Sequence, residues 1–315
     1  MSMSSTSSVR WFTKESLVKG RPSDISCVEI NGQTYSLSGR SLKIMRLDDE
    51  WYDDVRDPEE TIRVLRTQRD VRVDLFTFWQ RLPDLTPHHL SFHTDWDEIA
   101  ILPTHSFDDW WNNQIKSRVR SLVRKAEKEG IVVQETSYDD EFVGGMTAIF
   151  NEAPVRQGRR FWHYGKDFET IRRQFARYIH REHMIGAYYR DELIGFIMLG
   201  NAGRFAITGQ IISSLKHRDK ATNNVLIAKA VEVCEQRGFE WLVYLFWSDD
   251  SLGEFKRRCG FQRTRVPRYF VPLTPLGRAA LLIGAHKGWK TMLPSQLKKT
   301  LKRARSAWYD VLHPS

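Results

Sequence analysis

Hydrophobic and polar residues alternate along residues 25–37, ISCVEINGQTYSL, on both sides of Asn31-Gly32. Alternation with a period of two is typical of strands that bury one face. Asn-Gly is a preferred connection between two such strands, because both residues accept the positive φ of a tight turn. The pattern therefore predicts a β-hairpin with its turn at Asn31-Gly32.

The segment after this hairpin contains a helix start and two further strand patterns. A helix is predicted to begin at Asp57-Pro58, since Asp is a good N-cap and proline fits the first helical position. Residues 71–79 and 90–102 look like strands. We therefore expect residues 1–103 to form a small α+β region.

A long helical pattern begins at Ser106, where Asp109 completes a start that resembles a capping box. It runs through WWNNQIKSRVRSLVRKAEKE and ends at Gly130, because glycine readily adopts the conformation that follows a helix. We expect a single helix over this stretch.

The remaining pattern predicts a fixed succession of elements in the order β-α-α-β-β-β-α-β-α-β. The expected elements are strand 131–136, helices 140–152 and 167–181, strands 184–190, 192–200 and 204–212, helix 222–237, strand 240–246, helix 249–259 and strand 261–271. A tight turn at Asp191-Glu192 is expected between the first two strands of the central group. Two basic helices are expected beyond Pro275.

The charge of the chain points to an anionic partner. Its 48 Lys and Arg against 39 Asp and Glu give a formal net charge of +9, which suits nucleic acid, a phosphorylated donor or a lipid surface. The three cysteines have no metal-ligand spacing, and no carboxylate or cysteine stands at a convincing metal-ligand spacing from His88, His89 and His93, so no metal site is predicted. The polar N-terminus and the short apolar runs predict a cytoplasmic protein.

Two motifs carry a family resemblance. Residues 118–130, RVRSLVRKAEKEG, and 252–261, LGEFKRRCGF, together with the element order, resemble the Fem-type and BioF2-like branch of the GNAT superfamily. The similarity covers residues 75–272. It implies an α+β fold in which a GNAT-like mixed sheet flanked by helices occupies residues 104–272. Basic amphipathic helices would follow over 273–315, and residues 1–103 are either a separate region or a reduced first GNAT-like half.

The resemblance also implies a donor site. In this fold the strands at 204–212 and 240–246 splay apart, and the helix from residue 222 points its N-terminus at the donor phosphates. The usual loop before that helix is Q/R-x-x-G-x-G/A, whereas this chain reads Arg218-Asp219-Lys220-Ala221-Thr222-Asn223, with Asn223 expected to tolerate left-handed geometry. The predicted donor-binding residues are His217, Arg218, Lys220, Asn223 and Asn224.

Amide formation needs a neutral amine, hydrogen-bond donors for the oxyanion and a proton or cation at the leaving group. Lys256 of FKRRCGF stands where Fem-type proteins have a lysine that stabilises the reacting ester, so the resemblance implies a catalytic role for it. The alternative is an exposed lysine beside Arg257 and Arg258. Tyr244 and Gln210, on the two splayed strands, are further candidates, Tyr244 as a catalytic residue and Gln210 as a substrate contact.

The loop NEAPVRQGRRFWHYGK, at 151–166, is unusually rich in arginine and aromatic residues. We interpret Glu152 as a catalytic base or amine anchor. The other substrate-binding candidates are Arg156, Gln157, Arg159, Trp162, His163 and Tyr164. The alternative is that the rings pack beneath the loop.

Two functions remain open at this stage. The first is an N-acyltransferase, N-acetyltransferase-like in fold, that uses acyl-CoA or aminoacyl-tRNA as donor and has no tightly bound cofactor. Its acceptor would be an amine on an anionic molecule related to the cell envelope or to saccharides. The second is a non-catalytic GNAT-fold protein that binds nucleic acid or an envelope component. The basic amphipathic helix near 295–312 would either dock on the domain or contact RNA or a membrane surface.

Overall fold

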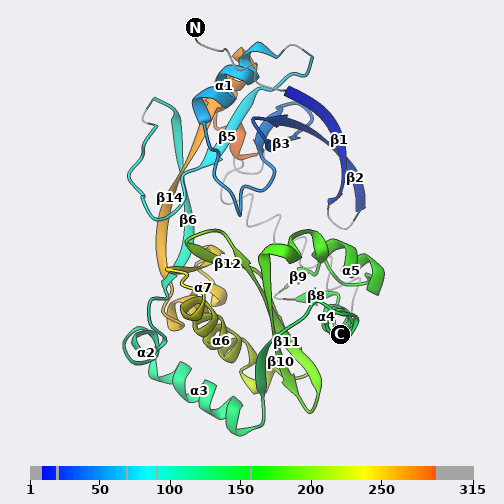
Figure 1. Cartoon of the computed structure of the whole chain (residues 1–315), viewed down its shortest axis with the longest axis vertical. Coiled ribbons are helices and arrows are strands. Elements are labelled where there is room, and N and C mark those ends of the chain that lie inside the picture. Colours follow the sequence, from blue (N-terminus) through cyan, green and yellow to red (C-terminus); the bar gives the residue numbers. More distant parts are fainter. Residues whose placement is uncertain (1–8, 19–20, 69, 90, 157, 289–315) are drawn as a thin grey trace.

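The computed structural model describes residues 9–18, 21–68, 70–89, 91–156 and 158–288. Two halves lie one above the other and share a single twelve-stranded sheet (Figure 1). The strand order is β1-β2-β3-β4-β5-β14-β6-β13-β12-β11-β10-β7. The predicted α+β class with a GNAT-like mixed sheet flanked by helices is confirmed.

The N-terminal half contains one helix and the first five strands. These are β1 (Val9–Val18), β2 (Arg21–Ile30), β3 (Gln33–Ser38), β4 (Ile44–Leu47), α1 (Pro58–Thr67) and β5 (Leu75–Trp79). The hairpin at Asn31-Gly32 is confirmed, with φ of 50° and 71° at its two turn residues. The helix begins at Pro58 as predicted, and the Asp57 carboxylate accepts a hydrogen bond from the amide of Glu60.

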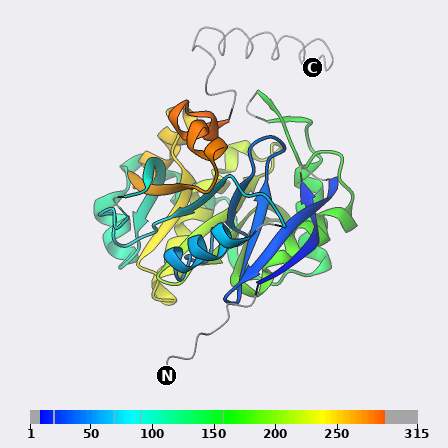
Figure 2. The same cartoon turned by 90° about the horizontal axis from the view of Figure 1, so that it is seen from above.

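Two long strands connect the halves. These are β6 (His93–Pro103) and β14 (Gln262–Pro272). β14 is the last strand in sequence, yet it lies between β5 and β6 and is antiparallel to both. β14 therefore pairs with strands of both halves. The domain boundaries at residues 103 and 272 stay predictions. Beyond it, α8 (Pro275–Leu282) and η4 (Ala285–Lys287) lie away from β1 and β2 (Figure 2).

The C-terminal half carries the remaining strands and most of the helices. Before the central strands come α2 (Phe107–Asp109), the π-helical turn η1 (Trp110–Gln114), α3 (Ser117–Lys128), β7 (Val132–Thr136), α4 (Asp140–Phe150), β8 (Val155–Arg156), β9 (Arg159–Arg160), α5 (Phe168–Phe175) and the 3₁₀ segment η2 (Ala176–Arg181). The central part consists of β10 (Glu182–Tyr189), β11 (Glu192–Asn201), β12 (Phe205–Ser213), η3 (Arg218–Lys220), α6 (Thr222–Gln236), β13 (Trp241–Phe246) and α7 (Ser251–Arg258).

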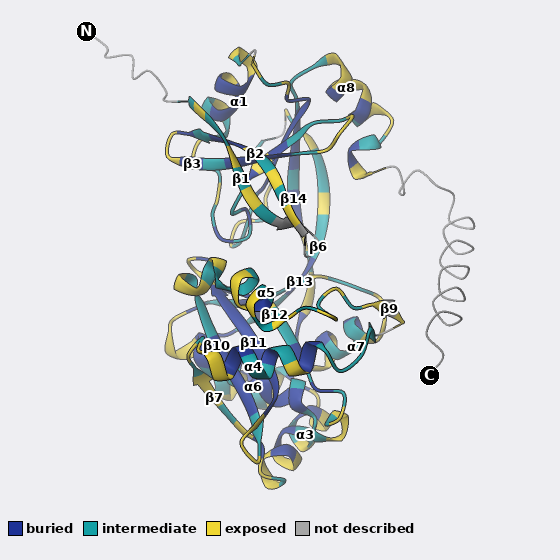
Figure 3. Cartoon of the chain, turned by 90° about the vertical axis from the view of Figure 1, so that its right-hand side faces the viewer, coloured by how far each residue is buried: buried dark blue, intermediate teal, exposed yellow. Residues whose placement is uncertain are grey.

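Helices cover both faces of this part of the sheet. α3 and α6 pack on one face, with Ile197 of β11 in their core, while α4 and α5 pack on the other face against Met198. Adjacent residues of β11 therefore enter opposite cores, which is why nearly the whole strand is buried (Figure 3).

Three local expectations were wrong. The helix expected from Ser106 to Gly130 is broken at Ile115, because Trp110 is fully buried and its indole N–H donates to the carbonyl of Cys259. The helix expected over 167–181 changes to 3₁₀ geometry at Ala176. The tight turn before β11 uses Arg190 and Asp191, with φ of 50° and 63°, one residue earlier than expected.

The described residues contain no helix with the length and hydrophobicity required to cross a membrane. Of the two basic helices expected beyond Pro275, α8 begins at that residue. The helix predicted near 295–312 lies outside the described residues.

Candidate functional site

The site begins where two neighbouring strands separate. β12 and β13 pair in parallel only from Phe205 to Ile207, opposite Trp241 to Val243. Immediately afterwards β12 has a bulge, because Met198 pairs with Gln210 while Leu199 pairs with Thr208, leaving Gly209 unpaired. The predicted V-shaped opening between these strands is confirmed. Backbone groups beyond this point are free of the ladder between β12 and β13.

Lys256 stabilises β13, the strand on the other side of this opening. β13 also has an extra residue, since Val243 pairs with Ile101 and Phe246 with Ile99. The Lys256 Nζ donates to the carbonyl oxygens of Tyr244, Leu245 and Phe246 at 2.8, 3.3 and 2.6 Å. Its ammonium therefore satisfies three carbonyls that the bulge turns out of regular pairing.

The burial of Lys256 decides between the two interpretations of its position. Only 2% of the surface of Lys256 is exposed to solvent, so the alternative of an exposed lysine is wrong. Burial lowers the pKa of Lys256 to about 8. The ammonium lies 4.2 Å from the Tyr244 ring, behind the residues that line the opening. This geometry supports a positioning role for Lys256, and its direct catalytic role stays a prediction.

A cleft of about 770 Å³ follows the splayed strands, and we call it the β12–β13 cleft. Eight of the predicted site residues line it: Arg156, Trp162, Gln210, His217, Arg218, Asn223, Asn224 and Tyr244. Five others do not: Glu152, His163, Tyr164, Lys220 and Lys256. Gln157 and the side chain of Arg159 lie outside the described part of the chain. Burial raises the pKa of Tyr244, so its phenol stays protonated at neutral pH.

The N-terminus of α6 opens into this cleft without a side-chain cap. Ala221 is the N-cap residue and has a φ of 54°, so Ala221 and not Asn223 takes the left-handed conformation. The hydroxyl of Thr222 and the side-chain oxygen of Asn223 are buried there without a hydrogen-bond partner. The first amides of a fifteen-residue helix are favourable for an anion, because they carry the positive end of the helix dipole.

The basic residues of the preceding loop divide between two surfaces. Arg218 and His217 line the cleft, and the His217 Nε2 lies 3.6 Å from a carboxylate oxygen of Glu192. Lys220 turns away, and its ammonium is 3.0 Å from the Glu129 carboxylate, whose hydrogen bond raises the pKa of Lys220. The predicted donor contact by Lys220 is therefore wrong in this structure, because its charge is used by the end of α3.

Glu152 and Arg156 form a largely buried ion pair, so neither charge is free to bind a ligand. The Glu152 carboxylate accepts hydrogen bonds from the Ser214 hydroxyl, the Leu215 amide and the Arg156 guanidinium. Arg156 also donates to the carbonyls of Ile149 and Ser213. Glu152 has its oxygens occupied, so its predicted role as a base is not supported. Arg156 lines the cleft but mainly ties α4 to the end of β12.

The rings of the 151–166 loop separate into packed and exposed groups. His163 stacks on Phe150 with ring centroids 4.5 Å apart, and burial lowers the pKa of His163 to about 4. Its predicted pocket role is wrong, because an aromatic cluster of α4 and α5 surrounds it. Tyr164 is exposed outside the cleft, whereas Trp162 is exposed at the cleft wall.

A second, smaller pocket of about 210 Å³ lies beside β12, and we call it the Glu182 pocket. Its lining consists of Trp51, Tyr52, Gln174, Phe175, Tyr178, Glu182, Met198, Ile207, Gly209, Gln210 and Leu245. Gln210 lines this pocket and the β12–β13 cleft, so the two meet at the bulged strand. Glu182 and Tyr52 were not predicted from the sequence, because the two residues lie 130 positions apart and no local motif connects them.

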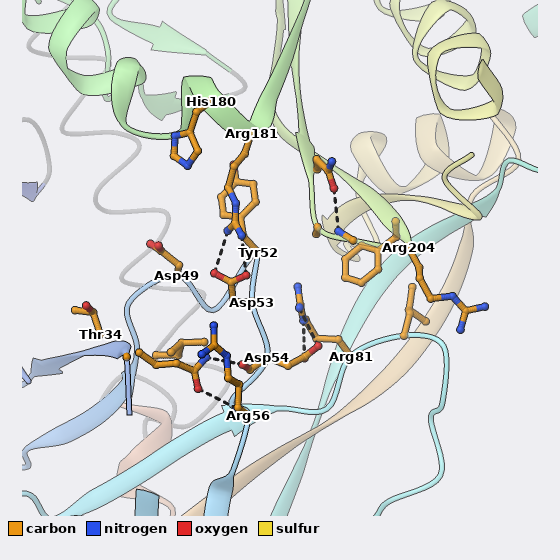
Figure 4. A pocket seen from close by; sticks show the side chains of 18 of the residues that line it. Thr34, Asp49, Tyr52, Asp53, Asp54, Arg56, Arg81, His180, Arg181 and Arg204 are labelled. Atoms are coloured by element: carbon orange, nitrogen blue, oxygen red, sulfur yellow. Dashed lines mark hydrogen bonds and ion pairs between the residues drawn. The ribbon is translucent and has the colours of Figure 1, made fainter. Parts of the chain in front are cut away.

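A broad groove of about 870 Å³ lies between the two halves (Figure 4). Arg181 points at the Asp53 carboxylate and Arg81 at that of Asp54, with closest contacts of 2.8 and 2.7 Å. Arg177 adds contacts to Asp48 and Asp49. Most of the charge in this groove is therefore paired. The pairs of Arg177 and Arg181 hold the loop after β4 against η2, and the pair of Arg81 holds it against the segment after β5.

The fold is similar to solved structures that align over most of both chains. The C-terminal domain (DUF2156) of a putative lysylphosphatidylglycerol synthetase from Agrobacterium fabrum aligns with a TM-score of 0.53 and 12% identity, covering 79% of this chain and 84% of that one. FemX aligns with a TM-score of 0.50 and 12% identity, covering 85% and 90%. L-PGS from Bacillus licheniformis aligns with a TM-score of 0.53 and 12% identity, covering 80% and 85%.

No family model and no curated protein matches the sequence. At 12% identity, the structural likenesses show the fold. The resemblance to the Fem-type branch of GNAT proteins is confirmed at that level.

Proposed function

We propose that this protein is an N-acyltransferase that moves an acyl or aminoacyl group from an activated donor to an amine. The observation that carries the proposal is the splay of β12 from β13 beside the uncapped N-terminus of α6. The edge of β12 that leaves β13 after Ile207 suits an extended acyl arm, and the helix terminus suits its phosphate. Arg218 and His217, at the same end of the cleft, add positive charge.

The chemistry needs no covalent enzyme intermediate. A neutral amine attacks the donor carbonyl carbon, and a C–N bond forms while the oxygen becomes an oxyanion. Collapse breaks the C–S bond of a thioester or the C–O bond of an ester. The amine nitrogen then loses a proton, and the leaving group gains one. Tyr244 lines the cleft as a protonated phenol, which makes it the candidate proton donor to the leaving group.

Acyl-CoA and aminoacyl-tRNA are both retained as donors in this proposal. An anionic acceptor related to the envelope or to saccharides also stays part of it, supported by the exposed Arg160 and Trp162 at the cleft wall. If no donor binds, the alternative of a non-catalytic binding protein is favoured.

Calorimetric titration with acetyl-CoA, palmitoyl-CoA and alanyl-tRNA at two salt concentrations tests the donor site. We expect one donor class to bind, and Arg218→Ala to weaken its binding and lower the salt slope by about 0.7 to 0.9. Arg278→Ala on α8 is the matched control, because Arg278 is exposed and distant from the cleft. The bound donor is then incubated with amino acids, amino sugars and aminophospholipids, and mass spectrometry detects new amides. Absence of binding by all three donors would overturn the proposal.

A further inference from the structure

We propose that the Glu182 pocket binds a primary ammonium group, and that Glu182 is its counter-charge and proton acceptor. This inference rests on the transferase function proposed above and assigns the side from which the amine arrives. It also gives the N-terminal half a direct part in the site, because the loop after β4 contributes Trp51 and Tyr52 to the pocket.

Glu182 is a half-buried carboxylate that lacks a cation. Within the part of the chain that the structure describes, its one hydrogen-bond partner is the Tyr52 hydroxyl, which donates to Oε1 at 2.6 Å. The adjacent Arg181 is engaged with Asp53, and no ion pair to Glu182 occurs among the residues that the structure describes. A carboxylate withdrawn from water without a cation is unfavourable, so this arrangement suits a cationic ligand.

The carboxylate lies at the point where β12 leaves β13. A Cβ atom added at Gly209 would be 3.1 Å from the Glu182 Oε1, so the glycine at the bulge makes room for the carboxylate against the strand. The next residue, Gln210, lines both this pocket and the β12–β13 cleft. An amine held at Glu182 is thus beside the strand along which the donor arm is proposed to lie.

The walls of the pocket are aromatic. Tyr52 and Tyr178 lie with ring centroids 4.6 Å apart, and Trp51 and Phe175 complete the lining on that side. Aromatic faces attract ammonium groups through their negative quadrupole. A volume of about 210 Å³ suits an alkylammonium end and is too small for a bulky headgroup.

The proton transfer balances without any further reactant. The bound R–NH₃⁺ gives one proton to the Glu182 carboxylate and becomes R–NH₂, which attacks the donor carbonyl. As the C–N bond forms and the bond to the leaving group breaks, the leaving thiolate or alkoxide takes a proton from the Tyr244 phenol, and the second proton of the nitrogen restores that phenol. Glu182 then releases its proton to solvent.

Among the titratable groups around Glu182, its own carboxyl is the one whose pKa is shifted toward neutrality. Burial raises the pKa of Glu182 from its ordinary value. The facing titratable groups are Tyr52, Tyr138 and Tyr178, whose pKa values burial raises further above neutrality. Arg181 has a raised pKa beside Asp53 and stays charged. His183, the next residue on β10, lies 3.9 Å from Glu135 and is directed toward Phe239.

The first test measures binding without any acyl transfer. The full chain labelled with [δ-¹³C]glutamate is titrated with pH, and the Glu182 resonance is assigned as the one missing from Glu182→Gln. We expect n-butylammonium to lower the pKa of Glu182 by about one unit, as an opposite charge nearby does, and n-butanol to leave it unchanged. An unchanged Glu182 titration at saturating n-butylammonium would overturn the ammonium site.

The second test measures turnover with whichever donor binds. Glu182→Gln is expected to lower kcat/KM about 100-fold and to remove the acidic limb of the pH profile, since proton transfer by a positioned group contributes on this order. Tyr52→Phe is expected to shift that limb to higher pH, because the hydrogen bond from Tyr52 favours the carboxylate. Glu235→Gln, exposed at the far end of α6, is the matched control. An unchanged limb in Glu182→Gln would exclude proton acceptance.

Two amines could occupy the pocket, and a third comparison separates them. If the ammonium belongs instead to an aminoacyl donor, Glu182→Gln weakens binding of alanyl-tRNA but not of N-acetylalanyl-tRNA, and this result would overturn the role of Glu182 as proton acceptor for the attacking amine. If it belongs to the acceptor, the KM for the amine rises and binding of both donors is unchanged. These outcomes also distinguish the ammonium site from the transferase function. If butylammonium binds but no donor is turned over, only the transferase function is refuted. If turnover occurs and Glu182→Gln has wild-type kinetics, only the ammonium site is refuted.

Discussion

Tyr52 and Glu182 are 130 residues apart in sequence, and the Tyr52 hydroxyl donates a 2.6 Å hydrogen bond to the Glu182 carboxylate. One residue belongs to the loop after β4 and the other begins β10, so the bond crosses from the N-terminal half to the C-terminal half. The ion pair between Arg181 and Asp53 lies next to it. The contact joins the halves beside the bulge at Gly209, where the two proposed substrates would meet.

The stability of Glu182→Gln relative to the wild type should increase as the pH rises. Burial raises the pKa of Glu182, so the folded state holds its proton at a pH where the unfolded chain, with a pKa of about 4.3, has released it. The contribution of Glu182 to the free energy of unfolding therefore decreases as the pH rises from the pKa of the unfolded state to that of the folded state. Urea unfolding from pH 4 upward should show the variant gaining stability over the wild type with pH. A constant difference across this range would contradict the raised pKa.

Lys256→Met should lower stability and turnover together. Three carbonyls of the β13 bulge would lose their hydrogen-bond donor, and we expect a loss of about 3 kcal/mol in the free energy of unfolding. Lys128→Met, exposed in the last turn of α3, is the control and should change stability by less than about 0.5 kcal/mol. Lost turnover with unchanged stability would instead favour a direct catalytic role.

Arg156→Ala should destabilise the fold. The change leaves the carbonyls of Ile149 and Ser213 without a donor and the buried Glu152 without its cation. Breaking a buried pair of this kind costs about 3 to 5 kcal/mol. Arg160→Ala is the matched control, since Arg160 is exposed at the same cleft, and its melting temperature should match the wild type. Equal melting temperatures for both variants would show that Arg156 is not structural.

Ala221→Gly should raise stability. Ala221 has a φ of 54° at the N-cap of α6, and a left-handed conformation costs a non-glycine residue about 1 to 2 kcal/mol. Part of that gain is offset by the greater freedom of glycine in the unfolded chain, which leaves about 0.5 to 1 kcal/mol. Ala279→Gly, exposed in the helix α8, should have the opposite sign and cost about 1 kcal/mol. A loss of stability in Ala221→Gly would show that the alanine side chain stabilises the loop.

The sequence by itself determined several turns and helix ends, and the order of the main strands and helices from residue 131 onward. Asn31-Gly32, Asp57-Pro58 and Gly130 act through backbone preferences that need only near neighbours, and each marks the expected element or its end. The splay of β12 from β13 was predicted only through the family resemblance that this order and the two motifs carry, and the short pairing from Phe205 to Ile207 agrees with it. The same reasoning placed Gln210, Tyr244, Arg218 and Asn223 at the cleft.

Only the tertiary structure decided how charged side chains are used. Whether Lys256 was exposed or buried depended on the β13 bulge, and whether Arg156 and Glu152 were free depended on Ser213 and Ser214, about 60 residues away. Lys220 and Arg218 are two residues apart, yet one pairs with Glu129 and the other lines the cleft. The pairing of Tyr52 with Glu182 has no local signal at all, because hydrogen bonds and burial between distant segments arise only when the halves pack together.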